Sequence, residues 1–261
     1  SRAARNAIDM ALHDLWGKRL GQPVYRLLGL NPRRLPETSF TIGMDEPARM
    51  GERARQCGYP ILKVKLGGQQ DEAMLAAIRQ GAPTAHLRVD ANAAWSRDQA
   101  TGLIPILARY GVEIIEQPLK EDDIEGHRMF RQALAALGVS ILVFVDESVK
   151  TARDVAAWAG VVDGVVIKLM KSCGIREASR AIHTARAHGM QVMLSCMVES
   201  SLGVTAAAHL APLCDYVDLD GPLLIANDPF EGIHYEGSRL ILPDRPGLGV
   251  VRRNFAVGSC A

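Results

Sequence analysis

The chain has 261 residues, of which 48% are hydrophobic and 23% charged, and its 30 lysines and arginines nearly balance 29 aspartates and glutamates. This composition is typical of a globular domain, and the length suits one large domain such as an α/β barrel. A net charge of +1 offers no general attraction for nucleic acid or anionic lipid, and no apolar run reaches the roughly 20 residues that cross a bilayer. We therefore expect no nucleic-acid partner and no membrane role.

The start of the chain has the pattern of a helix from the middle of a protein. Helical periodicity begins by the third residue and places Ala4, Ile8, Leu12 and Leu15 on one face. No secretory signal segment precedes this helix. Five scattered cysteines, without a Cys-x-x-Cys pair, favour a reduced cytoplasmic protein. We expect that a region before Ser1 is missing from this chain.

Eight short apolar or β-branched segments follow the first helix, at 39–42, 61–66, 87–90, 113–116, 142–146, 164–169, 191–196 and 216–220. Segments of helical length separate them, and two begin with capping boxes, at Ser96 with Gln99 and at Thr151 with Asp154. The repeat of roughly 26 residues predicts parallel strands joined by right-handed crossovers, as in an α/β barrel.

An open doubly wound sheet is the alternative fold, but no Gly-x-Gly-x-x-Gly turn follows the first strand. We expect residues 1–37 to form a helix and a connection, residues 38–225 a catalytic barrel, and residues 226–261 a C-terminal closing segment.

Charged residues end six of the predicted strands: Lys63 and Lys65, Asp90, Glu116, Asp146, Lys168, and Asp218 with Asp220. Strands of a parallel barrel are buried on both faces and should be apolar throughout. The C-terminal strand ends are also where barrel enzymes place their active sites. A structural ion pair would explain any one of these residues, whereas the complete ring favours a functional site.

The carboxylates of Asp90, Glu116 and Asp146 come from consecutive strands, with no His or Cys among them. Oxygen ligands of this kind suit Mg²⁺ or Mn²⁺ better than zinc. Lys65 and Lys168 end the second and sixth strands, half a circumference apart in an eight-stranded barrel. We therefore expect the two amines to face each other across the barrel mouth, beside the metal.

Two opposed bases beside a divalent cation suit the removal and return of a proton on a carbon next to a carboxylate. A lysine can act as a base near neutral pH when burial and nearby cations lower its pKa, and Lys63 supplies such a charge beside Lys65. Removal from one face and return from the other inverts the carbon. The residues thus predict a racemase or epimerase, or a related enolate-forming lyase or isomerase.

The segments KVK, VDAN, IEQP, VDES and IKLMKSCG, in this order, resemble the enolase superfamily and its muconate-lactonizing subgroup. The resemblance implies a modified (β/α)₇β barrel, with Lys65 and Lys168 as the acid/base pair and Lys63 as the stabiliser of the substrate carboxylate and enolate. The implied Mg²⁺ or Mn²⁺ ligands are Asp90, Glu116 and Asp146, supported by Asn92 and Glu147.

The last two strands end in SCMVESSLG and VDLDGPLL. Asp218 and Asp220 of the second segment resemble the paired aspartates with which dipeptide epimerases hold the α-ammonium of a dipeptide such as Ala-Glu. Period-two spacing places both carboxylates on one face, where they suit a compact cation. In the alternative, only Asp220 reaches the site. Glu199 is a weaker candidate, and Cys196 is expected to be a packed strand residue.

The leading hypothesis is a Mg²⁺-dependent dipeptide epimerase, a cytoplasmic isomerase that acts as a homo-oligomer on a small dipeptide through an enediolate intermediate. The alternatives are a muconate-type cycloisomerase, an o-succinylbenzoate synthase-like dehydratase, or an inactive barrel fragment. The resemblance also implies an N-terminal α+β capping domain that closes over the substrate, and this domain is expected to be absent from the chain.

Overall fold

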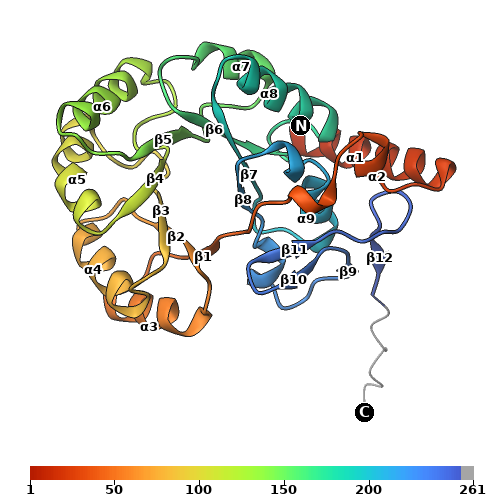
Figure 1. Cartoon of the computed structure of the whole chain (residues 1–261), viewed down its shortest axis with the longest axis horizontal. Coiled ribbons are helices and arrows are strands. Elements are labelled where there is room, and N and C mark those ends of the chain that lie inside the picture. Colours follow the sequence, from red (N-terminus) through yellow and green to blue (C-terminus); the bar gives the residue numbers. More distant parts are fainter. Residues whose placement is uncertain (254–261) are drawn as a thin grey trace.

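The computed structural model describes residues 1–253, so residues 254–261 of the expected closing segment, including Cys260, lie outside the described residues. Eight parallel strands form one sheet in chain order, and Figure 1 shows them as an inner ring with helices around the outside. The strands are β1 (Phe40–Ile42), β2 (Ile61–Lys65), β3 (His86–Asp90), β4 (Val112–Glu116), β5 (Leu142–Val145), β6 (Gly164–Lys168), β7 (Gln191–Ser195) and β8 (Tyr216–Asp218). The predicted barrel is confirmed.

The helices between the strands are α3 (Pro47–Cys57), α4 (Asp71–Gly81), α5 (Arg97–Arg109), α6 (Ile124–Ala136), α7 (Ala152–Ala157), α8 (Ile175–Ala187) and α9 (Ser201–Ala208). Both predicted capping boxes are present, with Ser96 before α5 and Thr151 before α7. Each cap satisfies backbone N–H groups that the first helical turn leaves unpaired, which stabilises a helix by about 1 kcal/mol. Several strands are shorter than predicted, and because β5 and β8 end early, Asp146 and Asp220 lie just beyond their strands.

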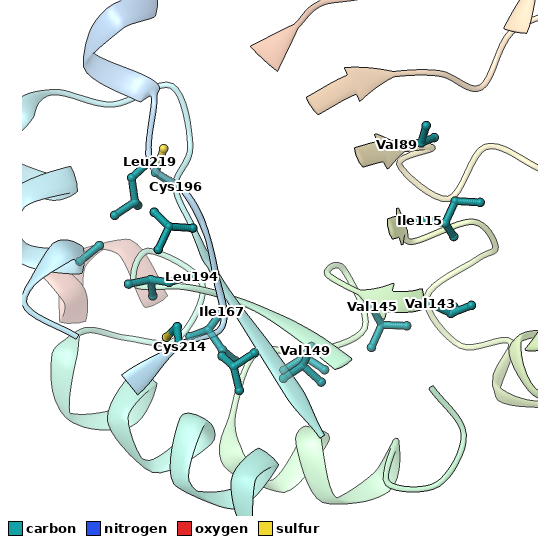
Figure 2. Close-up of a cluster of buried hydrophobic side chains, with 14 of the residues drawn as sticks. Val89, Ile115, Val143, Val145, Val149, Ile167, Leu194, Cys196, Cys214 and Leu219 are labelled. Carbon is teal, nitrogen blue, oxygen red and sulfur yellow. The ribbon is translucent and has the colours of Figure 1, made fainter. Parts of the chain in front are cut away.

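The two faces of the strands carry different side chains. Outward-facing residues such as Val89, Ile115 and Ile167 belong to a large apolar cluster that also contains helix residues such as Leu107 (Figure 2). A much smaller cluster fills the barrel interior, formed by Ile114, Phe144, Val166 and Met193. The apolar core therefore lies mainly between strands and helices. Polar side chains occupy the barrel interior at the C-terminal ends of the strands.

The barrel closes between β8 and β1 through few backbone contacts. A single isolated bridge pairs Thr38 with Val217, and the N–H of Ser39 donates to the Val217 carbonyl at 3.2 Å. The Thr38 hydroxyl accepts from the Leu219 N–H at 2.9 Å. We call this junction the β1–β8 seam. Because its backbone pairing is sparse, side-chain hydrogen bonds carry much of the closure.

The N-terminal helix α1 (Arg2–Leu20) is confirmed, but its predicted apolar face does not pack against the barrel. Ile8 and Leu12 are 63% and 60% exposed. The buried side of α1 instead contains Asn6 and Gly17, and a side chain at Gly17 would meet the backbone of Gly247 at 2.6 Å. The close approach of α1 therefore uses its smallest residue and not its largest apolar ones.

Polar contacts attach α1 and α2 (Val24–Leu27) to the barrel. The Asp9 carboxylate accepts from the Ile175 N–H at the start of α8, at 2.6 Å. The Tyr25 N–H donates to Nδ1 of buried His209 at 3.0 Å, and Nε2 of His209 lies 3.2 Å from the Leu248 carbonyl oxygen. Burial lowers the pKa of His209 to about 4, so the neutral ring makes both contacts.

The remaining elements are η1 (Pro32–Arg34), η2 (Ala211–Leu213), η3 (Gly221–Leu224), β9 (Phe230–Glu231), β10 (His234–Glu236), β11 (Arg239–Ile241) and β12 (Val251–Arg252). The last four strands form two antiparallel pairs, β9 with β12 and β10 with β11. Among residues 1–253, none of the helices combines the length and the apolar character that crossing a bilayer requires.

Candidate active site

A cavity of about 340 Å³ opens at the C-terminal ends of the barrel strands. Its lining contains eight of the ten predicted site residues, and the remaining lining residues lie outside that predicted set. The lining residues are Thr41, Lys63, Lys65, Asn92, Asp146, Glu147, Lys168, Lys171, Cys196, Met197, Val198, Asp218, Asp220 and Leu224. Two predicted residues, Asp90 and Glu116, lie beneath this lining and are buried.

Lys63 occupies the centre of the buried carboxylates. Its Nζ lies 2.8 Å from Glu116 Oε2, 2.9 Å from Asp218 Oδ2 and 3.2 Å from Asp90 Oδ2. Burial lowers the pKa of Lys63, but these three carboxylates raise it by more, so its pKa is well above the usual lysine value. Lys63 is therefore a fixed cation that holds carboxylates from three strands together.

Lys65 points into the same mouth, two residues further along β2. Its Nζ donates to Asp90 Oδ2 at 2.6 Å and to Asn92 Oδ1 at 2.8 Å. The Asn92 amide donates in turn to Glu147 Oε1 at 3.1 Å. Burial raises the pKa of Asp90, but Lys63 and Lys65 lower it by more, so its pKa is well below the usual range. Lys65, Asn92 and Glu147 thus form one hydrogen-bonded chain along the mouth.

Lys168 stands on β6, half the ring away from Lys65, as its strand number predicts. Its Nζ donates to Asp146 Oδ2 at 2.8 Å. Lys171 contacts the same carboxylate and donates to the Asp146 carbonyl oxygen at 2.7 Å. Lys171 has no predicted role, although it stands in the quoted segment IKLMKSCG, three residues after Lys168. The Asp146 carboxylate therefore lies between two lysines.

The predicted lowering of the pKa of the acid/base lysines is not found for Lys168. Burial lowers the pKa of Lys168, but the Asp146 carboxylate, with a smaller contribution from Glu116, raises it above the usual lysine value. The prediction considered neighbouring cations, whereas the groups in contact with these amines are anions. This arrangement thus favours the protonated forms of Lys63 and Lys168 while the neighbouring carboxylates are charged.

The three predicted metal ligands supply oxygen donors that suit Mg²⁺, and one donor lacks a partner. Glu116 Oε1 is buried without a hydrogen bond. Burial and the charges of Asp90 and Asp146 raise the pKa of Glu116 to about 8. Within residues 1–253, no group of three or more acidic, His or Cys side chains is arranged to hold a metal ion as it stands, and lysine amines lie on oxygens of Glu116 and Asp146. The donor chemistry nevertheless fits a hard divalent cation.

Asp218 and Asp220 both line the cavity, next to the β1–β8 seam. The Asp218 carboxylate accepts from Ser39 Oγ and Ser195 Oγ, each at 2.8 Å, in addition to its contact with Lys63. Burial raises the pKa of Asp218, but Lys63 lowers it by more, to about 2. The two serines are site residues that sequence reasoning missed; both are polar residues at ends of otherwise apolar strand segments.

Asp220 is less fully satisfied than Asp218. Its carboxylate accepts from the Thr41 N–H at 2.6 Å. Burial and the charge of Asp218 raise the pKa of Asp220 to about 6. A carboxylate with this surrounding gains from a cation placed in the cavity, because such a cation would offset the repulsion from Asp218.

Cys196 and the weaker candidate Glu199 follow β7. Cys196 is buried directly after this strand and burial raises its pKa, as expected for a packed residue and not a nucleophile. Glu199 accepts from the Met197 N–H at 3.1 Å and does not line the cavity.

The family model named Enolase C-terminal domain-like matches residues 46–254, which include seven of the eight barrel strands and every charged residue of the mouth. The chain belongs to the enolase superfamily. A second model, the mandelate racemase / muconate lactonizing enzyme N-terminal domain, matches residues 1–29, which contain α1 and α2. The superfamily therefore describes the first helix as part of its N-terminal domain.

Relatives in the superfamily include characterised epimerases. The chain is 41% identical to the L-Ala-D/L-Glu epimerase of Bacteroides thetaiotaomicron, with 96% of the chain and 64% of that protein aligned. It is also 41% identical to the hydrophobic dipeptide epimerase of Roseobacter litoralis, covering 94% of the chain and 72% of the relative. The chain thus spans about two thirds of the length of these relatives.

A solved structure shares the fold closely. The dipeptide epimerase of Cytophaga hutchinsonii, complexed with Mg and the dipeptide D-Ala-L-Val, has a TM-score of 0.89 at 32% identity. The match covers 96% of this chain and 70% of that one. The likeness extends over almost the whole described barrel.

Proposed function

We propose that this chain is the catalytic barrel of a Mg²⁺-dependent dipeptide epimerase. One observation carries the proposal: two aspartates, Asp218 and Asp220, line the same cavity as the opposed lysines Lys65 and Lys168. The cavity combines two lysines that could move a proton with two neighbouring aspartates that could bind a cation. We call these two aspartates, Asp218 and Asp220, the double-acid wall. Relatives named as L-Ala-D/L-Glu and hydrophobic dipeptide epimerases support the same activity.

In the proposed reaction, Lys65 and Lys168 act on opposite faces of the α-carbon of the C-terminal residue. One lysine, as the neutral amine, takes the α-proton and becomes an ammonium, which leaves an enediolate, and the other lysine, as the ammonium, gives a proton to the opposite face and becomes the neutral amine. Lys63 places a positive charge near the substrate carboxylate. Because the two lysines stand on β2 and β6, neither needs to move around the substrate to complete the inversion.

Asp90, Glu116 and Asp146 would hold Mg²⁺, which supplies positive charge to the substrate carboxylate when bound. Asn92 and Glu147 would hold these ligands and Lys65 in place through the hydrogen bonds described above. Asp146, which would be one of these ligands, now contacts both Lys168 and Lys171, and Lys168 also lines the cavity where the substrate would bind.

The ammonium group of the dipeptide would bind beside Asp218 and Asp220. Asp218 already pairs with Lys63, so Asp220 is the principal acceptor in this proposal. Solved muconate cycloisomerases have a similar fold, with 30% identity for the Pseudomonas fluorescens enzyme. The double-acid wall disfavours their anionic class of substrate, and it disfavours an o-succinylbenzoate-type substrate for the same reason.

Incubation with candidate dipeptides in D₂O and Mg²⁺ tests the proposal. We expect deuterium at the α-carbon of the C-terminal residue together with inversion, first for Ala-Glu and for dipeptides with apolar residues. Exchange followed by NMR and chiral chromatography measures both events. No exchange with any dipeptide, in a protein that also includes the remaining length of its relatives, would contradict the assignment.

Three further expectations stay predictions. The homo-oligomeric state and the cytoplasmic location are two of them; among the described residues, Cys57, Cys173, Cys196 and Cys214 are free thiols. The third is the division into a connection (1–37), a barrel (38–225) and a closing segment (226–261).

A further inference from the structure

Gln117 directly follows the proposed metal ligand Glu116, and its side chain is completely buried. Its amide oxygen accepts from the Asp146 N–H at 2.9 Å and from the Ser148 N–H at 3.3 Å. Its amide nitrogen donates to the Leu119 carbonyl oxygen at 2.9 Å. One uncharged side chain therefore fixes the backbone at Asp146 to the loop that follows Glu116.

The backbone of Gln117 makes two further connections between neighbouring loops. Its N–H donates to the Phe144 carbonyl on β5, and its carbonyl accepts from the Ala93 N–H in the loop after β3, both at 2.8 Å. Gln117 thus bonds to the segments that follow β3, β4 and β5. Asp90 and Glu116 are the last residues of β3 and β4, and Asp146 is the first residue after β5, so all three carboxylates lie where these segments begin.

Gln117 also has a strained backbone, with φ of 40°. A non-glycine residue in this left-handed region costs of order 1–3 kcal/mol and persists where its surroundings determine its conformation. Asn92 and Ala93, at the end of β3, share this feature, with φ of 44° and 61°. The strain is concentrated beside two of the proposed ligands.

We propose that Gln117 is a positioning residue that sets the spacing of the three carboxylates and thereby the affinity of the site for a divalent cation. The inference rests on the proposed metal site. Gln117 does not line the cavity, so it acts through its neighbours and not on substrate. Its role requires an amide, because the same side chain must accept from Asp146 and donate to Leu119.

The substitution Gln117→Glu tests this role with almost no change of shape. A carboxylate keeps the acceptor for the Asp146 N–H but turns an oxygen toward the Leu119 carbonyl oxygen. We expect Mn²⁺ affinity, measured by electron paramagnetic resonance without substrate, to fall by about 10–100-fold, the usual effect of losing a group that orients metal ligands. At saturating Mg²⁺ the turnover number should recover to near the wild-type value.

Leu134→Ala serves as the matched control, because Leu134 is buried in α6 and does not line the cavity. It should lower the melting temperature while leaving Mn²⁺ affinity unchanged. If Gln117→Glu does not fold, Ser148→Ala removes one partner of the Gln117 amide and should weaken Mn²⁺ binding in the same direction.

Two results would overturn the inference in distinguishable ways. A wild-type protein that binds no Mn²⁺ removes the proposed metal site and this role together. A wild-type protein that binds Mn²⁺, with folded Gln117→Glu and Ser148→Ala variants that bind it within twofold of the same affinity, removes only the role of Gln117.

Discussion

Lys65 and Lys168 are the residues on which the proposed inversion depends. Lys65→Ala and Lys168→Ala should each lower the epimerisation rate by about 10²–10⁴-fold, the range typical of general acid/base groups. Each variant should also lose α-proton exchange for one configuration of the substrate and keep it for the other, because each amine faces one side of the carbon. Exchange in D₂O with the two separate epimers measures this difference.

Lys150→Ala provides the control for these lysine variants, because Lys150 pairs with Glu121 outside the cavity lining. It should exchange both epimers at the wild-type rate. Loss of both configurations in one lysine variant would contradict a two-base arrangement and favour a single base.

The proposed role of Asp220 predicts substrate recognition that depends on pH. Its pKa is raised to about 6, so its carboxylate is charged and suited to an ammonium well above pH 6 and loses that charge as the pH falls through about 6. kcat/KM for a dipeptide should therefore decline on the acid side with a pKa near this value. Asp220→Asn should raise KM by about 10–100-fold, the loss of one charge-assisted hydrogen bond, and should abolish that acid limb.

The pH profiles of the wild type and of Asp220→Asn provide the measurement. An unchanged acid limb in the variant would assign the limb to another group. Mg²⁺ affinity should be equal in the two proteins, since Asp220 is not a proposed ligand.

At this scale the sequence predicted the charged ring well, because charges in buried parallel strands are rare and easily recognised. It did not predict which amine meets which carboxylate. Lys171 and Ser195 escaped notice because a lysine in a loop and a serine beside a cysteine are ordinary, and only tertiary packing brings them to Asp146 and Asp218.

Among the elements, the strands and the capped helices follow from local sequence, whereas the packing of α1 does not. Its periodicity predicts a helix, but not which side faces the barrel. The contacts of Asp9 and Gly17 decide that side, and they involve residues more than 160 positions away, Ile175 and Gly247. No pattern within the helix contains that information.

His209 links α2 to the barrel and makes this attachment sensitive to pH. The pKa of its folded state, about 4, lies below the unfolded value of 6.5. Its contribution to stability is therefore complete above pH 6.5 and is lost as the pH falls toward 4, by about 3 kcal/mol in total. The charged or titratable groups that face it are His13 and Asp14 of α1, with Tyr25 stacked on the ring.

His209→Gln should remove this part of the acid destabilisation while preserving a donor and an acceptor for Leu248 and Tyr25. Urea denaturation at pH 7 and pH 4.5 measures the difference. The wild type should lose more stability than the variant between these pH values, and an equal loss in both would contradict the assignment.

At the scale of the whole molecule, the metal site proposed at Asp90, Glu116 and Asp146 would make stability depend on a divalent cation. A cation that binds only the folded state stabilises it by about 2.7 kcal/mol at a concentration of one hundred times Kd. For a chain of this size the melting temperature should rise by roughly 5–10 °C. Thermal denaturation with Mg²⁺, and again after chelation, measures the shift.

Glu116→Gln supplies the comparison, because it retains the size of the side chain but removes the carboxyl group that would bind the cation. Its melting temperature should respond much less to Mg²⁺. An equal response in the variant and the wild type would locate the stabilising cation elsewhere.

The β1–β8 seam links local opening of the barrel to the proposed binding of substrate. The Asp218 carboxylate accepts from Ser39, and the Asp220 carboxylate accepts from the N–H of Thr41. The two carboxylates proposed to bind the substrate ammonium therefore also connect β1 to the end of β8. Local opening between β1 and β8 would therefore also disrupt the ammonium site proposed at Asp218 and Asp220. Backbone hydrogen exchange should be fastest at β1 among the strands of the barrel. It should slow when a dipeptide binds, because a ligand on Asp218 and Asp220 would stabilise the contacts between β1 and β8.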